Sequence, residues 1–296
     1  MNMRLIFLCC IVCISLTISI VSASEKSCDE LNADSENLWM ENKLSESDTF
    51  LDEAIRICPD RADLYWRKAR TIFYRIENLP RDKKPEKAEL LKSYQEVEAL
   101  ADRCIELDGN NGSCMLWKGV AMGRRGTTQG VLKSLWMAEE VEGSWLKAIS
   151  LKPSYRSKDG YNNHFGDTHY ALGMFYRVVP EWLCHFPLKQ IIGTCGDKEK
   201  SVDYQRKALA CEPERIGYNK ELAVSLLCHG QKYKRPEEIE EAKKLLNGLQ
   251  SLPAVRPMDK IDKEHAKMLL DDISIACGYS RDKQQELSKE AYDKNK

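Results

Sequence analysis

The chain has 296 residues, of which 45 are lysine or arginine, 46 are aspartate or glutamate and 31% are charged in total. The formal net charge of −1, without a basic tract or interleaved arginines and aromatics, argues against nucleic acid as a partner. Segments that alternate apolar and polar residues are almost absent, so the composition favours helices over strands.

The N-terminal residues have the pattern of a secretory leader. A short basic region, Met1 to Arg4, precedes 17 residues without a charge, Leu5 to Val21, and small residues follow at Val21-Ser22-Ala23. This order predicts a signal peptide over residues 1–23, cleavage before Ser24, and a secreted, periplasmic or lumenal protein. The alternative is that residues 5–21 are retained as a membrane anchor, which is the one case in which we expect membrane contact.

The cysteines support export. Nine of the 12 lie beyond the predicted leader, and none forms a CxxC motif or a Cys/His cluster with zinc spacing. Disulfides in an oxidising compartment therefore fit better than a metal site. The short loops Cys104/Cys114 and Cys184/Cys195 give the first pairs to test. Because nine is odd, at least one thiol is free, modified or intermolecular.

A helix ending recurs four times beyond the leader. In each case a small residue on an apolar helical turn is followed five positions later by a proline or a glycine. Both residues end helices readily, so this position is predicted to be a helix stop. A second small position recurs in the helix that follows each stop, at Ala69, Gly119, Gly173 and Ala223. The four endings are AIRICP from Ala54, CIELDG from Cys104, AISLKP from Ala148 and ALACEP from Ala208.

This pattern resembles the tetratricopeptide repeat (TPR) family. The likeness spans Leu31 to Tyr279 and is best in THYALGMFYR followed by SVDYQRKALACEP. It implies an all-α, TPR-like solenoid of stacked antiparallel helix pairs. The equivalent small residues are 50, 44 and 60 positions apart, whereas the family repeat is about 34 residues. Long helices and insertions are therefore expected.

A narrower likeness comes from GRRGTTQGVLKSLW, the long helix after it, and an insertion that contains EWL. Here the chain is similar to the regulator-of-microtubule-dynamics family and its bacterial exported relatives, and more distantly to the T component of TRAP transporters. The predicted leader argues against a cytosolic microtubule role and favours the exported relatives.

The predicted organisation is a repeat domain over residues 24–280 and a charged, solvated tail over 281–296. About five helix pairs and the first helix of a capping pair fill the domain. The predicted ranges are 30–58 for the first pair, 60–77 with 85–107, 112–123 with 127–151, 166–178 with 198–211, 215–229 with 236–250, and 259–278 for the cap.

The stretch GRRGTTQG, residues 123–130, is predicted to be the turn inside the third pair. Its glycines permit a sharp reversal, and Thr127 or Thr128 would cap the next helix. Arg124 and Arg125 would then lie beside a helix N-terminus, where they could hold an anion. The alternative is that they are solvated turn residues.

Candidate catalytic residues are few. In HFGDTH, His164, Asp167 and His169 could share a metal or a general-base task. However, residues five apart diverge on a helix, and Asp167 is predicted to be a helix N-cap. Nucleophile-elbow, zincin and phosphate-loop motifs are absent. We therefore predict a non-enzymatic protein without a metal or cofactor.

The predicted function is binding of a protein segment or peptide in the groove of the helical array. Aromatics and arginines near the insertion are the expected groove residues. Resemblance to the TRAP T component implies the alternative of a small-ligand-binding or transport accessory protein, and a membrane-anchored regulator-of-microtubule-dynamics-like protein is the third. A deep pocket would favour a ligand, and an open groove a protein partner. The predicted groove or anion-binding residues are Arg124, Arg125, His169, Tyr170, Tyr176, Arg177 and Trp182.

Overall fold

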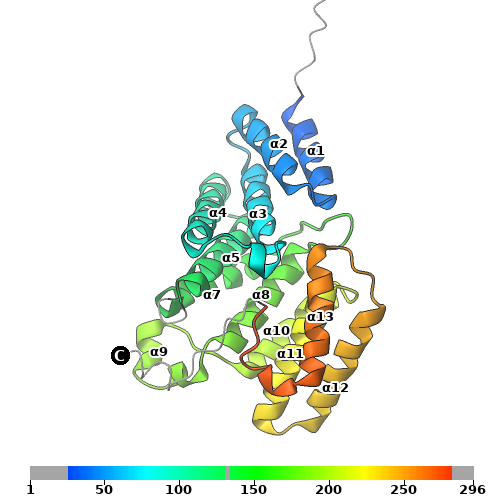
Figure 1. Ribbon diagram of the computed structural model, residues 1–296. Coiled ribbons are helices and arrows are strands. Elements are labelled where there is room, and N and C mark those ends of the chain that lie inside the picture. Colours follow the sequence, from blue (N-terminus) through cyan, green and yellow to red (C-terminus); the bar gives the residue numbers. More distant parts are fainter. Residues whose placement is uncertain (1–25, 131–133, 282–296) are drawn as a thin grey trace, which may run out of the picture.

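The computed structural model describes residues 26–130 and 134–281. Its helices pack as consecutive antiparallel pairs that form a curved solenoid (Figure 1), which confirms the predicted fold class. Within the described residues, the β-structure consists of one isolated bridge between Arg156 and Asn163. The helices are α1 Cys28–Met40, α2 Leu44–Ile57, α3 Ala62–Glu77, α4 Lys87–Leu107, α5 Gly112–Gln129, α7 Ala138–Leu151, α8 His164–Val178, α9 Leu188–Ile192, α10 Lys198–Cys211, α11 Ile216–Tyr233, α12 Pro236–Gly248 and α13 Pro257–Asp271.

The recurring small residues lie where neighbouring helices touch. The four small residues of the helix endings are fully buried, as are Ala69 and Ala223. A Cβ added at Gly119 would lie 2.4 Å from the indole nitrogen of Trp145, and one at Gly173 would lie 2.4 Å from Nε2 of Gln205. Side chains from the neighbouring helix therefore occupy the space that a larger residue would need.

The predicted turn at GRRGTTQG is wrong. Helix α5 continues to Gln129, and the first residue of this stretch with a positive φ is Gly130, at 123°. Thr127 donates its hydroxyl hydrogen bond back to the carbonyls of Gly123 and Arg124, so it does not cap a following helix. Gly126 is needed for packing, because a Cβ there would lie 2.8 Å from Cβ of Ser134.

The C-terminal part of the solenoid reaches back to its first helix. Arg256, just before α13, donates to the carbonyls of Trp39 and Met40 at the end of α1. Its guanidinium lies 4.4 Å from the Trp39 ring centroid and forms an ion pair with Asp159, in the loop between α7 and α8. In Figure 1 this green loop lies between the end of α1 and the start of α13. The pairs therefore curve around a concave side that is largely enclosed.

The end of the described chain differs from the prediction. The last helix stops at Asp271 rather than near 278, because the Asp272 carboxylate accepts from the backbone of Ser274 and starts a short turn. The chain then runs back inside the arc toward α8 (Figure 1, red). Arg281, predicted to be solvated, pairs with the buried Glu77 of α3 at 3.1 Å.

Three pairs of sulfur atoms lie at disulfide distance among the described residues. Cys104–Cys114 joins α4 to α5, and Cys184–Cys195 closes the insertion after α8. Both are pairs that short loop length pointed to. The third, Cys228–Cys277, ties α11 to the segment that returns along the concave side. Such pairs are typical of proteins from an oxidising compartment.

The predicted leader, residues 1–23, and the tail, residues 282–296, lie outside the described residues. Within the part of the chain that the structure describes, no helix combines the length and the apolarity needed to cross a bilayer.

Candidate functional site: a cavity on the concave side

The concave side contains a cavity of about 300 Å³, which is within the lower range of small-molecule sites. Helices α5, α7, α8, α11 and α13 contribute to its walls, together with residues 279–281. One wall is apolar. Its side chains include Leu116, Val120, Leu135, Met137, Val141, Met174, Phe175 and Val178.

Paired charges form another part of the cavity lining. Arg215, at the start of α11, donates to Asp167 of α8 at 2.7 Å, and the Tyr218 hydroxyl donates to the same carboxylate oxygen at 2.9 Å. Burial alone would lower the pKa of Arg215, but the Asp167 carboxylate holds that pKa well above its ordinary value. Burial also raises the pKa of the Asp167 carboxyl. The Arg215–Asp167 pair joins α8 to α11.

A second group of charges surrounds Lys220 of α11. Its ammonium group donates to Asp262 at 2.6 Å and to the Tyr279 hydroxyl at 2.9 Å, and it lies 3.2 Å from Glu221. Burial opposes the charge, yet Asp262 keeps the pKa of Lys220 well above its usual range. Because His265 also contacts the Tyr279 hydroxyl at 2.9 Å, this network connects α11, α13 and the returning segment.

Arg177 of α8 binds the backbone of the returning segment. Its Nη1 donates to the carbonyls of Ala276, at 3.3 Å, and Tyr279, at 2.8 Å, while Nη2 donates to Glu221 at 3.2 Å. The concave side thus binds a segment of the chain itself, residues 276–279, through hydrogen bonds to its main-chain carbonyls.

Tyr170 contributes its hydroxyl group to the cavity wall. Its ring packs against Tyr218 at 5.4 Å between centroids, and burial raises the pKa of its hydroxyl. Within residues 26–130 and 134–281, that hydroxyl has no hydrogen-bond partner. It is therefore suited to bind a polar group of a ligand.

The two arginines of GRRGTTQG lie in the C-terminal half of α5 rather than at a helix N-terminus, so the structure contradicts the geometry expected for anion binding. Arg124 lines the cavity and pairs with Glu77 at 2.8 Å. Arg125 points to α4, where Glu98 lies 3.2 Å away. Glu77 also accepts from the Tyr94 hydroxyl at 2.6 Å.

The structure separates the other predicted groove residues. Tyr170 and Arg177 line the cavity together with Arg124, whereas His169, Tyr176 and Trp182 do not. His169 and Tyr176 both pack on Tyr204 of α10, because residues seven apart share a helix face. Burial lowers the pKa of His169 to about 4.

The side chains of the HFGDTH stretch have separate surroundings: Asp167 pairs with Arg215, and His169 packs on Tyr204. His164 packs against the rings of Trp66 and Tyr155, and its Nδ1 is 2.7 Å from the Ser113 hydroxyl. Burial places its pKa well below the ordinary value. The helix N-cap is Asn163 rather than Asp167. Among the residues that the structure describes, no three potential metal-binding side chains gather.

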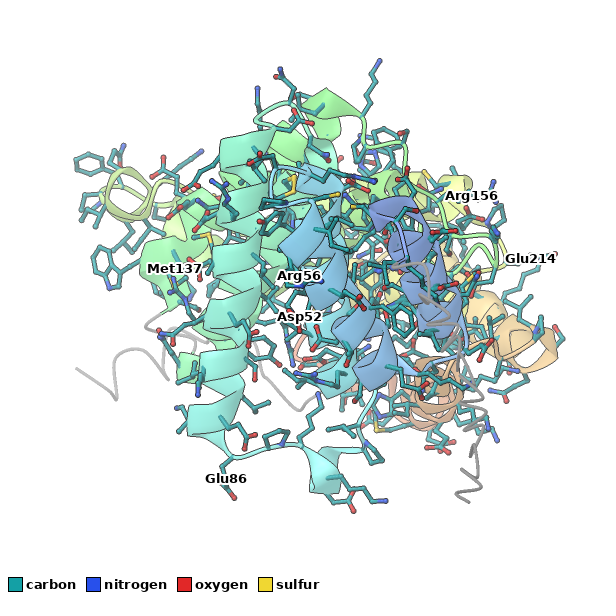
Figure 2. All side chains as sticks on the ribbon, turned by 90° about the horizontal axis from the view of Figure 1, so that it is seen from above. Asp52, Arg56, Glu86, Met137, Arg156 and Glu214 are labelled. Atoms are coloured by element: carbon teal, nitrogen blue, oxygen red, sulfur yellow. A yellow bond between two sulfur atoms is a disulfide. The ribbon has the colours of Figure 1, made fainter. Side chains whose placement is uncertain are left out.

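The sequence did not predict the surface beside the cavity. We call residues 179–197, closed by Cys184–Cys195, the stapled insertion. It packs on the start of α7 through a small apolar cluster that includes Leu135 and Leu183. Figure 2 shows α9 of this insertion standing out from the body near Met137. Around the cluster, Phe186 is 82% exposed, Trp136 71% and Ile191 54%. The residue types alone gave no sign that these three side chains face solvent.

Two solved structures match with low identity. One is titled as a functional characterisation of PilF from Pseudomonas aeruginosa, with 13% identity, a TM-score of 0.45, and coverage of 91% of this chain and 99% of that one. The other is a MamA RS-1 ArsTM double mutant, with 14% identity, a TM-score of 0.44, and coverage of 76% and 97%. No protein with curated function matches.

The family comparison covers most of the chain. The sequence pattern of the family described as regulator of microtubule dynamics protein 1-3 matches residues 26–274, which include all of the long helices up to and including α13. The chain therefore belongs to the regulator of microtubule dynamics protein 1-3 family.

Proposed function

We propose that the protein is a non-enzymatic, exported scaffold that binds a segment of a partner protein along its concave side and over the stapled insertion. The observation that carries this proposal is the exposed apolar surface at the cavity edge. Leu135, Ala138 and Val179 line the cavity and also belong to the apolar cluster of the stapled insertion. The exposed Trp136 and Phe186 belong to the same two chain segments as this cluster. Exposed aromatics next to a recess are typical anchors of a protein interface.

The chemistry of the concave side supports a peptide as the bound group. Arg177 donates to three main-chain carbonyls of residues 276–279, and Lys220 donates to the hydroxyl of Tyr279. The main chain of a partner segment offers carbonyl groups of the same kind. Export is supported by the three cysteine pairs at bonding distance and by the leader-like residues 1–23.

Crosslinking followed by pull-down from the source of the protein tests the proposal. Partners found with the wild type are then purified and their binding is measured with a variant that carries Trp136→Ala and Phe186→Ala. Met268→Ala is the matched control, because Met268 is also exposed but lies on α13. We expect the double variant to bind at least tenfold more weakly and the control to bind as the wild type does. Equal binding by all three proteins would refute the proposal.

The cavity itself favours a second candidate, a small ligand with an apolar body and one hydrogen-bonding group. The apolar wall would cover the body, and Tyr170 would bind the polar group. Native mass spectrometry of the purified protein would show such a ligand as a mass that is lost on denaturation. Met174→Trp should reduce its occupancy by filling the cavity, and Tyr170→Phe should weaken it. Unchanged occupancy in both variants would exclude this cavity.

A further inference from the structure

Two of the unpaired cysteines meet at the open end of the first helix pair. Cys28 begins α1 and is buried, and Cys58 follows the last residue of α2. Because α1 and α2 pack antiparallel, the start of one lies beside the end of the other. Both cysteines belong to the apolar cluster that contains Leu31 and Ala54.

One carbonyl shows how close the two cysteines are. The oxygen of Ala54 accepts from the Cys58 amide at 2.8 Å and from the Cys28 thiol at 3.8 Å. The Cys58 thiol is also close enough to Cys28 to help raise the pKa of the Cys28 thiol, after burial, which is the larger cause. Cys211, at the end of α10, belongs to another helix pair and donates to the carbonyl of Lys207. Cys28 and Cys58 are therefore each other's natural partners.

We propose that Cys28 and Cys58 form a fourth disulfide in the mature protein, which closes the α1–α2 pair and leaves Cys211 as the one free thiol. This pairing accounts for the odd number of cysteines beyond the leader, since four disulfides use eight of the nine. It would also fix the helix whose C-terminal carbonyls, of Trp39 and Met40, bind Arg256.

The oxidation requires a disulfide donor such as oxidised glutathione. The Cys58 thiolate, which is the more exposed, attacks one sulfur of the donor, and one donor thiolate leaves. Cys28 then loses its proton and attacks the Cys58 sulfur of the mixed disulfide, which forms the new bond and releases the second donor thiol. Two protein thiols are oxidised, and one donor disulfide is reduced to two thiols.

The surroundings of Cys28 indicate which cysteine attacks the donor first and which one attacks the mixed disulfide. Burial is the main cause that raises the pKa of Cys28 to about 11, and the Cys58 thiol adds to it. The guanidinium of Arg61, 3.7 Å from the Cys28 sulfur, would stabilise the thiolate when it forms. Cys28 is therefore suited to resolve a mixed disulfide held beside it rather than to attack a donor from solution.

The test uses the full chain secreted through an oxidising compartment, denatured without reductant and alkylated. Intact mass gives the number of free thiols, and peptide mapping gives the linkage. We expect one alkylated thiol in the wild type, two in Cys28→Ser and none in Cys211→Ser, with a peptide that joins Cys28 to Cys58. Three thiols in the wild type and two in Cys211→Ser would overturn the proposal, as would a linkage of Cys28 to any other cysteine.

Discussion

Arg177 of α8 and Glu221 of α11 form an ion pair at 3.2 Å in which the two side chains are only 2% and 3% exposed. The same guanidinium binds the carbonyls of the returning C-terminal segment. One side chain thus joins two helix pairs and the segment that lies along the concave side. We therefore expect the stability of this region to depend on the buried guanidinium of Arg177.

Arg177→Met should therefore destabilise the protein strongly. It leaves the buried Glu221 with less compensation and removes the donors to three carbonyls. Loss of one member of a buried pair costs about 3 kcal/mol or more. Urea unfolding measures the change. Arg206→Met is the control, because its pair with Glu241 is exposed and should be worth about 1 kcal/mol or less. Equal losses in both variants would contradict this account.

Gly119→Ala should destabilise the α5–α7 contact. The added Cβ would lie 2.4 Å from the Trp145 indole nitrogen, and overpacking of this kind costs about 1–3 kcal/mol. Gly143→Ala on α7 should have the opposite effect. Nothing lies within 4 Å of a Cβ there, and alanine in a helix is favoured over glycine by about 1 kcal/mol. Thermal unfolding of both variants checks the difference in sign.

Acid should weaken the protein through Glu36. Burial opposes its charge, but Arg70 and Arg67 outweigh burial and lower the pKa of this carboxylate to about 2. Because the folded-state pKa is depressed, the stabilisation is fully present above the unfolded-state value of 4.5 and is lost as the pH falls toward 2. Full protonation would remove about 3 kcal/mol. Urea midpoints between pH 7 and pH 3 should fall more steeply for the wild type than for Glu36→Gln.

Removal of the Cys228–Cys277 bond should loosen the returning segment. The bond closes a long loop, and its loss by Cys228→Ser is expected to cost about 3 kcal/mol. Limited proteolysis should then cut near residues 276–281 faster than in the wild type. Cys211→Ser should show neither effect, because Cys211 is unpaired and half-buried. An unchanged cleavage rate in Cys228→Ser would show that the noncovalent contacts of the segment, including those of Arg177 and Lys220, hold it without the bond.

Much of the fold followed from local residue patterns. Small residues at Ala54, Cys104, Ala148 and Ala208 recur before helix stops because close helix packing excludes larger side chains, and the structure buries all four completely. This pattern of small residues and helix stops depends only on spacing along one helix. It therefore predicted the paired helices from the sequence.

Prediction from local residue types failed where packing between helices overrides the turn preference of glycine. The glycines of residues 123–130 suggested a turn, yet Gly123 and Gly126 stay helical because Trp145 and Ser134 lie against them. The cavity was only partly predicted. Tyr170 and Arg177 face it, but their neighbours His169 and Tyr176 face α10, and the helix phase that separates them is set by the partner helices.

The sequence by itself determined the helical repeat, because the repeat depends on periodicity along the chain. Short loops also made Cys104/Cys114 and Cys184/Cys195 the first cysteine pairs to test, but the sequence left the connectivity open. The tertiary structure decided which arginines and tyrosines surround the cavity, that Cys277 meets Cys228 across 49 residues, and that Phe186 and Trp136 face solvent. These features arise where the superhelix brings distant segments together. Its curvature is the sum of many small packing angles, which no single stretch of sequence specifies.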